Sequence, residues 1–266
     1  MEEEEKIFFP EHYETKFDPY AYLTHYYSRK ALDDGTRLSL FALPTFARII
    51  EREMREDERQ SLIDIGAGPT VYTAICFRDV VKRVCLTDFL QKNLDILNDW
   101  LDRKRTFDWS PLIRIVCRME GECLVSGDEV HDIEEQARSL VTAGGIYHAD
   151  VTTSPCCQRE RLPIQQFDIL VSVFCLESAC TNYESYCQAM ANMLELLRPG
   201  GRLIIGSVLD EDRYVSGKST VFSLLALSEE EIRLAAEKND IDMQSARKFV
   251  LEDDGVMFFI ATKNQH

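Results

Sequence analysis

The sequence predicts an α/β fold, namely a doubly wound and mostly parallel sheet with helices on both faces. Short apolar segments alternate with segments of helical periodicity along most of the chain, and this alternation is typical of parallel α/β folds. The first apolar segment, 62–65, leads directly into a Gly-x-Gly turn. The last two, 241–250 and 256–262, are separated only by a short acidic turn, which predicts an antiparallel hairpin.

The first half of the chain predicts three βα units. A helix over 38–55 has apolar residues at intervals of three and four, and strand 62–65 follows it. Segment 167–174 is almost continuously apolar, as expected of a parallel strand buried on both faces. Between these two strands we expect a helix at about 70–78, a strand at 84–87, a helix at about 89–103, a strand at 113–117, a polar helix over 129–141 and a short strand at 146–148.

The second half carries two signals for helix starts. Residues 181–184 and 228–231 both have the spacing of a capping box, and we expect a helix after each. The first helix ends at the sequence Pro199-Gly200-Gly201, and the next strand begins at Leu203. The second helix ends at about Asn239.

No linker or internal repeat divides the chain, so we expect one domain over 11–266 after a disordered acidic tail at 1–10. The segment of about 11–58 precedes the first strand and holds a cluster of tyrosines. Two explanations stay open for this cluster: a helix packed on the core, or a lid that closes over a bound ligand. Half of the ten tyrosines lie here: Tyr13, Tyr20, Tyr22, Tyr26 and Tyr27.

Composition excludes several classes of function. The 266 residues carry a net charge of −16, which disfavours binding to nucleic acids and to anionic membranes. Two explanations of the negative charge stay open: solubility, or a preference for cationic ligands. Residues 1–5 are acidic and have no apolar core, so we expect no secretory signal. No apolar run approaches the ~18 residues that span a bilayer. The nine cysteines form no Cys-x-x-Cys pair, so we expect reduced thiols in a cytoplasmic protein and no metal site. The sequence carries no signal for an oligomeric state, and a monomer is assumed.

The Gly-x-Gly turn and a later acid predict a nucleoside site. Gly66 and Gly68 let the backbone approach a ligand, and Asp88 follows the next strand, where a carboxylate can hold a ribose. Val71 replaces the third glycine of a dinucleotide motif, and Pro69 removes an amide. A nucleoside without a diphosphate, such as S-adenosylmethionine, therefore fits better than NAD. An ordinary strand-to-helix turn is the alternative.

Five segments together resemble a known family. They are 64–72 (DIGAGPTVY), 87–90 (TDFL), 107–110 (FDWS), 174–177 (FCLE) and 197–201 (LRPGG). In this order they are similar to the small-molecule methyltransferases that include phenylethanolamine, nicotinamide and indolethylamine N-methyltransferases and a thioether S-methyltransferase. The resemblance covers about 13–261. It implies S-adenosylmethionine as the cofactor and a class I, Rossmann-like sheet of seven strands, the last one antiparallel.

The resemblance also implies which residues bind the cofactor. Two tyrosines come from the lid, the Gly-x-Gly turn lies beside the methionine part, and an acid holds the ribose. Alanine stands at position 67, where the family usually has serine, so one hydroxyl is lost. The implied cofactor residues are Tyr22, Tyr27, Gly66, Ala67, Gly68, Thr70, Tyr72, Asp88, Asn93, Asp150, Val151 and Val173.

On the acceptor side, the resemblance implies an acidic and aromatic site. Glu177 and Glu211 are the catalytic candidates, because a carboxylate can bind an ammonium group and remove its proton before attack. With a pyridine acceptor the same acids would stabilise the cationic product. The pattern is closer to a site for a protonated amine than for a neutral amide. The implied substrate residues are Phe174, Glu177, Glu211, Tyr214, Ser223 and Asp253.

Three alternatives accompany this prediction. Each acid can instead be a solvated surface residue, because charge runs usually are. A nicotinamide-nucleotide oxidoreductase would share the strand, the turn and Asp88, but it needs a diphosphate site. A catalytically inactive binding protein would keep the fold alone.

Overall fold

The computed structural model describes residues 6–34, 42–104, 107–122, 124–217, 219–251 and 255–265, and its centre is a sheet of seven strands. β2 (Ser61–Ile65) lies between β3 (Arg83–Asp88) and β5 (Phe167–Val173), and β4 (Ile146–His148) pairs with β3, all in parallel. β6 (Leu197–Val208) is parallel to β5. β10 (Val256–Lys263) is antiparallel to both β6 and β9 (Ile241–Leu251), which confirms the predicted end of the sheet.

The strand order places the ligand-binding edge of the sheet. From one edge to the other the order is β4-β3-β2-β5-β6-β10-β9. The chain moves outward from β2 to β4 and then returns to the other side of β2 with β5. Ligands of open α/β sheets bind beside the carboxyl ends of the strands at such a reversal. Here that position lies above the ends of β2 and β5.

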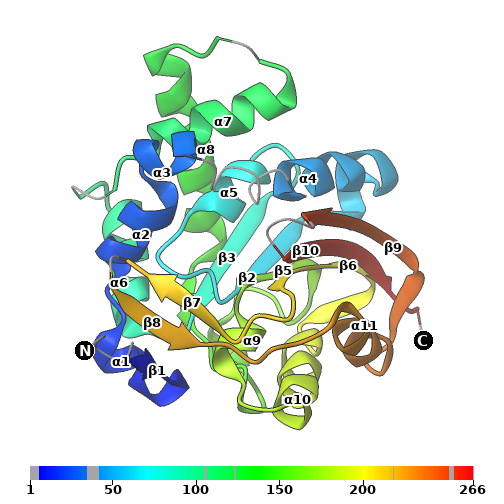
Figure 1. The fold of residues 1–266 in the computed structure, drawn as a ribbon. Helices are drawn as coiled ribbons and strands as arrows, with labels where there is room; N and C mark the ends of the chain where they lie inside the picture. The colour runs from blue at the N-terminus through cyan, green and yellow to red at the C-terminus, as the bar shows by residue number, and fades with distance from the viewer. Residues whose placement is uncertain are drawn as a thin grey trace.

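Helices cover both faces of the sheet (Figure 1). One core lies under α4 (Ala42–Glu53), α5 (Tyr72–Cys76), α6 (Gln91–Leu101), α7 (Ser110–Glu120) and α8 (Gly127–Gly144). The other lies under α9 (Leu176–Ala179), α10 (Tyr183–Leu194) and α11 (Glu229–Glu237). Strand residues alternate between the two cores: Leu62 and Val84 face the first, and Ile63 and Cys85 face the second.

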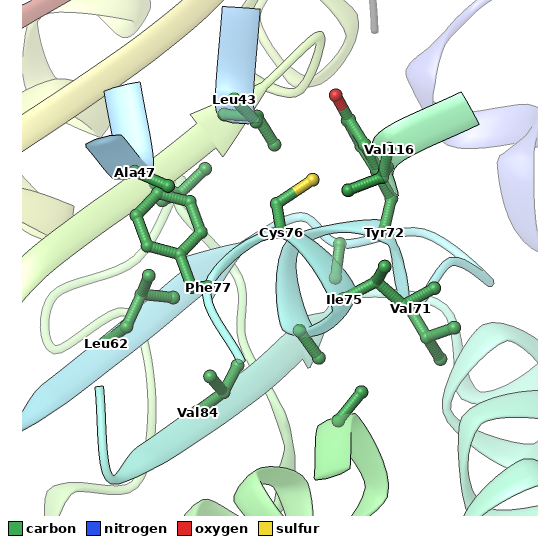
Figure 2. Close-up of a cluster of buried hydrophobic side chains, with 14 of the residues drawn as sticks. Leu43, Ala47, Leu62, Val71, Tyr72, Ile75, Cys76, Phe77, Val84 and Val116 are labelled. Atoms are coloured by element: carbon green, nitrogen blue, oxygen red, sulfur yellow. The ribbon is translucent and has the colours of Figure 1, made fainter. Parts of the chain in front are cut away.

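The short helix α5 is buried along its whole length. Its side chains fill the space between the central strands and the helices above them, and Phe77 follows directly behind it. This dense packing holds the Gly-x-Gly turn in place, because the turn is the connection between β2 and α5. Figure 2 shows the cluster, with Leu43, Ala47, Leu62, Val71, Tyr72, Ile75, Cys76, Phe77, Val84 and Val116 labelled.

A second, smaller sheet was absent from the sequence-based prediction. β7 (Arg213–Ser216) and β8 (Thr220–Ser223) form an antiparallel hairpin, and β1 (Ile7–Phe8) adds to β8 in parallel. β1 falls within the segment expected to be a disordered tail, so the chain is ordered from an earlier residue than predicted. α1 (Tyr13–Lys16) and α2 (Pro19–Tyr27) follow β1 and lie beside β7 and β8, whereas α3 (Arg29–Asp34) lies next to α7 (Figure 1).

The strand expected at 113–117 is wrong, because this segment lies inside α7. Its buried residues follow a helical spacing: Leu112, Ile113, Val116 and Cys117. A short run of β-branched residues does not distinguish a strand from a buried helix face. Pro111 in the first turn and Gly121 at the end, with φ of 100°, were the signals that favoured a helix.

Several element boundaries also differ from the prediction. β6 begins at Leu197 and includes the Pro-Gly-Gly sequence, which was expected to precede the strand. Gly200 adopts a φ of 72°, and this glycine allows the backbone to bend near the first residues of β6. α5 is shorter than the expected 70–78, and α4 is described only from Ala42 onward.

Candidate functional site

A cavity of about 390 Å³ opens at the carboxyl ends of β2 and β5, beneath the N-terminal helices. This volume lies in the range of small-molecule binding sites. Every residue expected to bind the cofactor lines the cavity in the structure: Tyr22, Tyr27, Gly66, Ala67, Gly68, Thr70, Tyr72, Asp88, Asn93, Asp150, Val151 and Val173.

The Gly-x-Gly turn is held by the neighbouring strand. The amides of Gly66 and Ala67 donate to the carbonyl of Thr87, at 3.0 and 2.8 Å. A Cβ at Gly66 would overlap the side chain of Cys175, whereas a Cβ at Gly68 would meet nothing within 4 Å. Gly66 therefore also makes room for Cys175, and both glycines line the cavity.

Asp88 is positioned by three N–H donors. Its Oδ2 accepts from the amide of Gly68 at 2.8 Å, and its Oδ1 accepts from the amide of Leu90 at 2.8 Å and from Nδ2 of Asn93 at 3.0 Å. Burial raises the pKa of Asp88, and these hydrogen bonds act in the opposite direction. The side-chain oxygen of Asn93 is buried without a partner among the described residues. Buried polar atoms are normally satisfied, so this oxygen is available to a ligand hydroxyl beside Asp88.

Asp64 is a buried acid in the cavity wall that the sequence analysis did not select. Burial raises its pKa to about 7, while a hydrogen bond from Thr73 lowers it and the charge of Asp88 raises it further. No ion pair joins Asp64 to a Lys or Arg in the described part of the chain. An acid in the middle of β2 (Ser61–Ile65), between apolar neighbours, was the signal that could have found it, because acids are rarely buried without a partner.

The N-terminal segment closes one side of the cavity by contacts with distant elements. Lys92 Nζ donates to the carbonyl of Phe17 at 2.6 Å, and the Tyr26 hydroxyl donates to the carbonyl of Val215 at 2.7 Å. Tyr13 stacks on Phe222 of β8, with ring centroids 4.2 Å apart. The segment is therefore docked on α6, β7 and β8, and it contributes aromatic walls to the cavity.

The part of the cavity wall where the resemblance places the methyl acceptor, here called the acceptor end, is aromatic and rich in hydroxyl groups. Phe174 and Tyr214, both expected there, line the wall. Phe174 has a φ of 55°, which is unusual for a bulky residue, and its ring meets Phe258 edge to face at 5.6 Å. Tyr13 and Ser178 also line this end and were not selected from the sequence. Tyr13 was noted there only as a member of the tyrosine cluster.

The acids expected at the acceptor end lie elsewhere in the described structure. Glu177 is 2% exposed and is absent from the cavity wall. Its Oε1 accepts from the Ser207 hydroxyl at 3.0 Å and from the Val208 amide at 3.1 Å. Burial raises the pKa of Glu177 to about 7, and the hydrogen bonds act against this rise.

The other expected polar residues also fall outside the described wall. Glu211 is an exposed residue ahead of β7, and Ser223 pairs with Arg213 in the β7–β8 hairpin. Asp253 lies outside the described residues. The acids that do line the cavity are Glu11, Glu14, Asp64, Asp88 and Asp150, and no Lys or Arg accompanies them in the described wall.

The described residues contain no group of three His, Cys, Asp or Glu side chains able to hold a metal ion. A search of the same residues finds no helix with the length and apolarity needed to cross a bilayer.

Comparisons with known proteins agree with this geometry. The model of the NNMT/PNMT/TEMT family matches residues 5–264. Nicotinamide N-methyltransferase of Caenorhabditis elegans is 30% identical over 257 residues, which are 93% of this chain and 89% of that protein. The human enzyme of that name is 33% identical over 210 residues, or 76% of each chain. Rat phenylethanolamine N-methyltransferase is 31% identical over 239 residues, covering 89% of this chain and 81% of that protein.

A solved structure with the same fold is magnesium protoporphyrin IX methyltransferase of Synechocystis, crystallised with bound S-adenosylmethionine. It superimposes with a TM-score of 0.56 and covers 96% of this chain and 95% of that one. Only 10% of the residues are identical, so this match shows the fold alone.

Proposed function

The chain belongs to the NNMT/PNMT/TEMT family and is an S-adenosylmethionine-dependent N-methyltransferase of small molecules, and from this premise we propose that its acceptor is an uncharged heteroaromatic nitrogen, as in a pyridine. The observation that carries the proposal is the position of Glu177 and Glu211. Neither carboxylate reaches the described wall of the cavity, and the two glutamates that do line it, Glu11 and Glu14, are exposed residues of the N-terminal segment.

The cofactor end suits S-adenosylmethionine in shape and charge. The Asp88 carboxylate and the unpartnered Asn93 oxygen lie side by side in the wall and would hold the two ribose hydroxyls. Asp64 supplies a buried acid without a cationic partner, so its ionised form would favour a positively charged ligand. The bound cofactor supplies an activated methyl group on its sulfonium. A diphosphate would meet acids and no described cation in the same wall, which disfavours a nicotinamide-nucleotide oxidoreductase.

The acceptor end suits a nucleophile that arrives with a free lone pair. An aliphatic amine is protonated at neutral pH, with a pKa near the ~10.4 of a lysine side chain. It therefore needs a base near the reacting nitrogen. A pyridine nitrogen is already uncharged at that pH, so the protein has only to place it in line with the methyl group and the sulfur. Positioning of this kind can supply several kcal/mol of the barrier.

The protein would perform this positioning with aromatic side chains. Phe174 and Tyr214 line the acceptor end, and Tyr13 and Phe17 reach it from the N-terminal segment. Together they enclose a flat ring and exclude water from it. The charge that develops on the nitrogen as the methyl group arrives would be stabilised by the tyrosine and phenylalanine faces.

A competition between acceptor classes tests the proposal. The purified chain is incubated at pH 7 with labelled S-adenosylmethionine and with either a series of pyridines or a series of phenylethylamines. We expect labelled product from the pyridines, with kcat/KM at least tenfold above that of any amine. Faster methylation of the amines would overturn the acceptor class. Absence of product with every acceptor, despite cofactor binding, would indicate an inactive binding protein.

A further inference from the structure

We propose that Lys92 is a positioning residue for methyl transfer, which holds the N-terminal segment over the cavity from the same turn of α6 that holds Asp88. The Lys92 ammonium donates to the backbone carbonyl of Phe17 at 2.6 Å. Lys92 is absent from the described cavity wall, so it acts through the residues that it holds. The inference rests on the proposed function only in placing the cofactor beside Asp88, and it is independent of the class of acceptor.

The Phe17 carbonyl lies at the joint between α1 and α2, where the helical hydrogen-bond pattern is interrupted. Phe17 ends α1, and Asp18 is the N-cap of α2. In a continuous helix the Phe17 carbonyl would accept from the amide of Ala21, four residues further on. Here the amides of Tyr20 and Ala21 donate to the Asp18 carboxylate, at 2.9 and 3.1 Å. Phe17 is buried, and a buried backbone carbonyl needs a partner, which Lys92 provides.

This joint sets the position of the aromatic cavity wall. α1 carries Tyr13 before the joint, and α2 carries Tyr22 and Tyr27 after it. These three side chains line the cavity, and so does Phe17 at the joint itself. A tilt at the joint would displace both short helices. The contact with Lys92 therefore determines where the aromatic side chains lie above the bound ligands.

The first turn of α6 connects the joint to the cofactor end. The Leu90 amide and the Asn93 side chain both donate to the Asp88 carboxylate, at 2.8 and 3.0 Å. The Leu90 side chain also packs with Phe17 in a small buried cluster, and α2 lies against α6 (Figure 1). Lys92 lies between Leu90 and Asn93 in this turn. A cofactor held by Asp88 and a docked segment should therefore favour each other, by the same factor in both directions.

The other side of the segment is held on β7 by neutral hydroxyl groups. The Tyr13 hydroxyl donates to the Tyr214 hydroxyl at 2.9 Å, and the Tyr26 hydroxyl donates to the Val215 carbonyl at 2.7 Å. The Lys92 contact is charge-assisted, and such hydrogen bonds are roughly twice as strong as neutral ones. Loss of the Lys92 ammonium should release the segment on the side of α6, next to the cofactor, while the contacts with β7 keep it attached.

The variant Lys92→Met tests this role, because it removes the ammonium and keeps an unbranched apolar side chain. The rate of S-adenosylmethionine release is measured by displacing labelled cofactor with excess unlabelled cofactor. We expect release from Lys92→Met to be about tenfold faster than from the wild-type chain, which is equivalent to about 1.4 kcal/mol. Lys92→Arg restores a cationic donor and should recover part of the loss. Lys92→Gln, with a shorter side chain, should match Lys92→Met and carries the test if Lys92→Met does not fold.

Lys263→Met is the matched control, because Lys263 makes the same kind of contact far from the cavity. Its ammonium donates to the carbonyls of Leu194 and Leu197, at 2.7 and 3.0 Å. Leu197 begins β6, so this contact lies at the amino ends of the parallel strands, opposite the cavity. The control should lose thermal stability and keep the wild-type rate of cofactor release.

Steady-state kinetics separates positioning from loss of folded protein. Because the wall is held less firmly, Lys92→Met should have higher KM values for S-adenosylmethionine and for the acceptor, with a kcat close to that of the wild-type chain. A purely structural role would lower kcat through the fraction of folded enzyme and would leave both KM values unchanged. That second pattern would overturn the inference.

Hydrogen exchange without any ligand distinguishes this inference from the proposed function. The amides of Phe17 and Tyr22 are hydrogen-bonded within the segment, and they should exchange faster in Lys92→Met than in Lys263→Met. Equal exchange in the two variants, or equal rates of cofactor release, would overturn the role of Lys92. If Asp88→Ala keeps its cofactor affinity while Lys92→Met shows both faster exchange and faster release, the proposed ribose site fails and the role of Lys92 stands.

Discussion

The two ends of the cavity are built in different ways. Most of the cofactor end comes from one continuous βαβ unit, in which Gly68, Asp88 and Asn93 lie within 26 residues and hydrogen-bond to one another. The acceptor end combines α9, β7 and the N-terminal segment, which are far apart in the sequence. A local unit keeps its geometry with few constraints from elsewhere. The acceptor end depends on how three distant segments dock, so small sequence changes can alter its chemistry.

The largest effect is expected at the centre of the cofactor end. Asp88→Ala removes the carboxylate and leaves the amides of Gly68 and Leu90 and the Asn93 side chain without their acceptor. Hydrogen bonds to charged groups contribute about 1.5–3 kcal/mol each. We therefore expect S-adenosylmethionine affinity to fall by at least 100-fold, as measured by calorimetry. Unchanged affinity in a folded variant would show that the ribose binds elsewhere.

A matched pair of glycine variants tests how the turn is built. Gly66→Ala would force a Cβ against Cys175, whereas Gly68→Ala meets open space, although both have a positive φ. Strain at such a φ costs of order 1–3 kcal/mol in each variant, and only Gly66→Ala adds the overlap. Thermal unfolding should show the larger loss for Gly66→Ala. Cofactor affinity should fall in Gly68→Ala, whose new methyl group enters the cavity. A larger loss of stability in Gly68→Ala would contradict this division of roles.

Asp64 makes cofactor binding depend on pH. Its pKa is about 7 in the empty site because of burial, and a cationic ligand binds better to the ionised carboxylate. Affinity for S-adenosylmethionine should therefore rise as the pH increases towards about 7 and level off above this value, with proton release on binding below it. Asp64→Asn should remove this pH dependence and leave the affinity at the level that the wild-type chain has at low pH. Calorimetry in buffers of different ionisation enthalpy measures the released proton, and a flat wild-type profile would exclude this role.

The smallest effect on catalysis is expected at Glu177. Burial raises its pKa from 4.5 to about 7, so between these values the folded state holds a proton that the unfolded state has lost. Stability should then decrease as pH rises from about 4.5 to 7 and stay constant above this range. Glu177→Gln keeps the acceptor oxygen for Ser207 and Val208, so it should remove this decrease and change the kcat/KM values of pyridines and amines by the same small factor. A selective loss with amines would restore Glu177 as their base.

Much of the cofactor end was predictable because its signals are local in sequence. A strand, a Gly-x-Gly turn and an acid after the next strand specify one βαβ geometry, and every residue assigned to the cofactor lines the cavity. The acceptor end was predictable only for its aromatic residues, Phe174 and Tyr214. Glu177 ends a buried strand, but the direction of its side chain depends on Ser207 and Val208 of β6, thirty residues away.

The sequence by itself determined the parallel sheet, its antiparallel end, the family and the Gly-x-Gly turn that lines the cavity, because periodicity, glycine positions and capping residues act over short distances. The tertiary structure decided which acids face the cavity, why position 66 must be glycine, and that segment 113–117 is helical. It also decided that β1 joins β8 and brings Tyr13 to Tyr214. These features depend on contacts between segments far apart in the chain, and such contacts leave no periodic signal in any one segment.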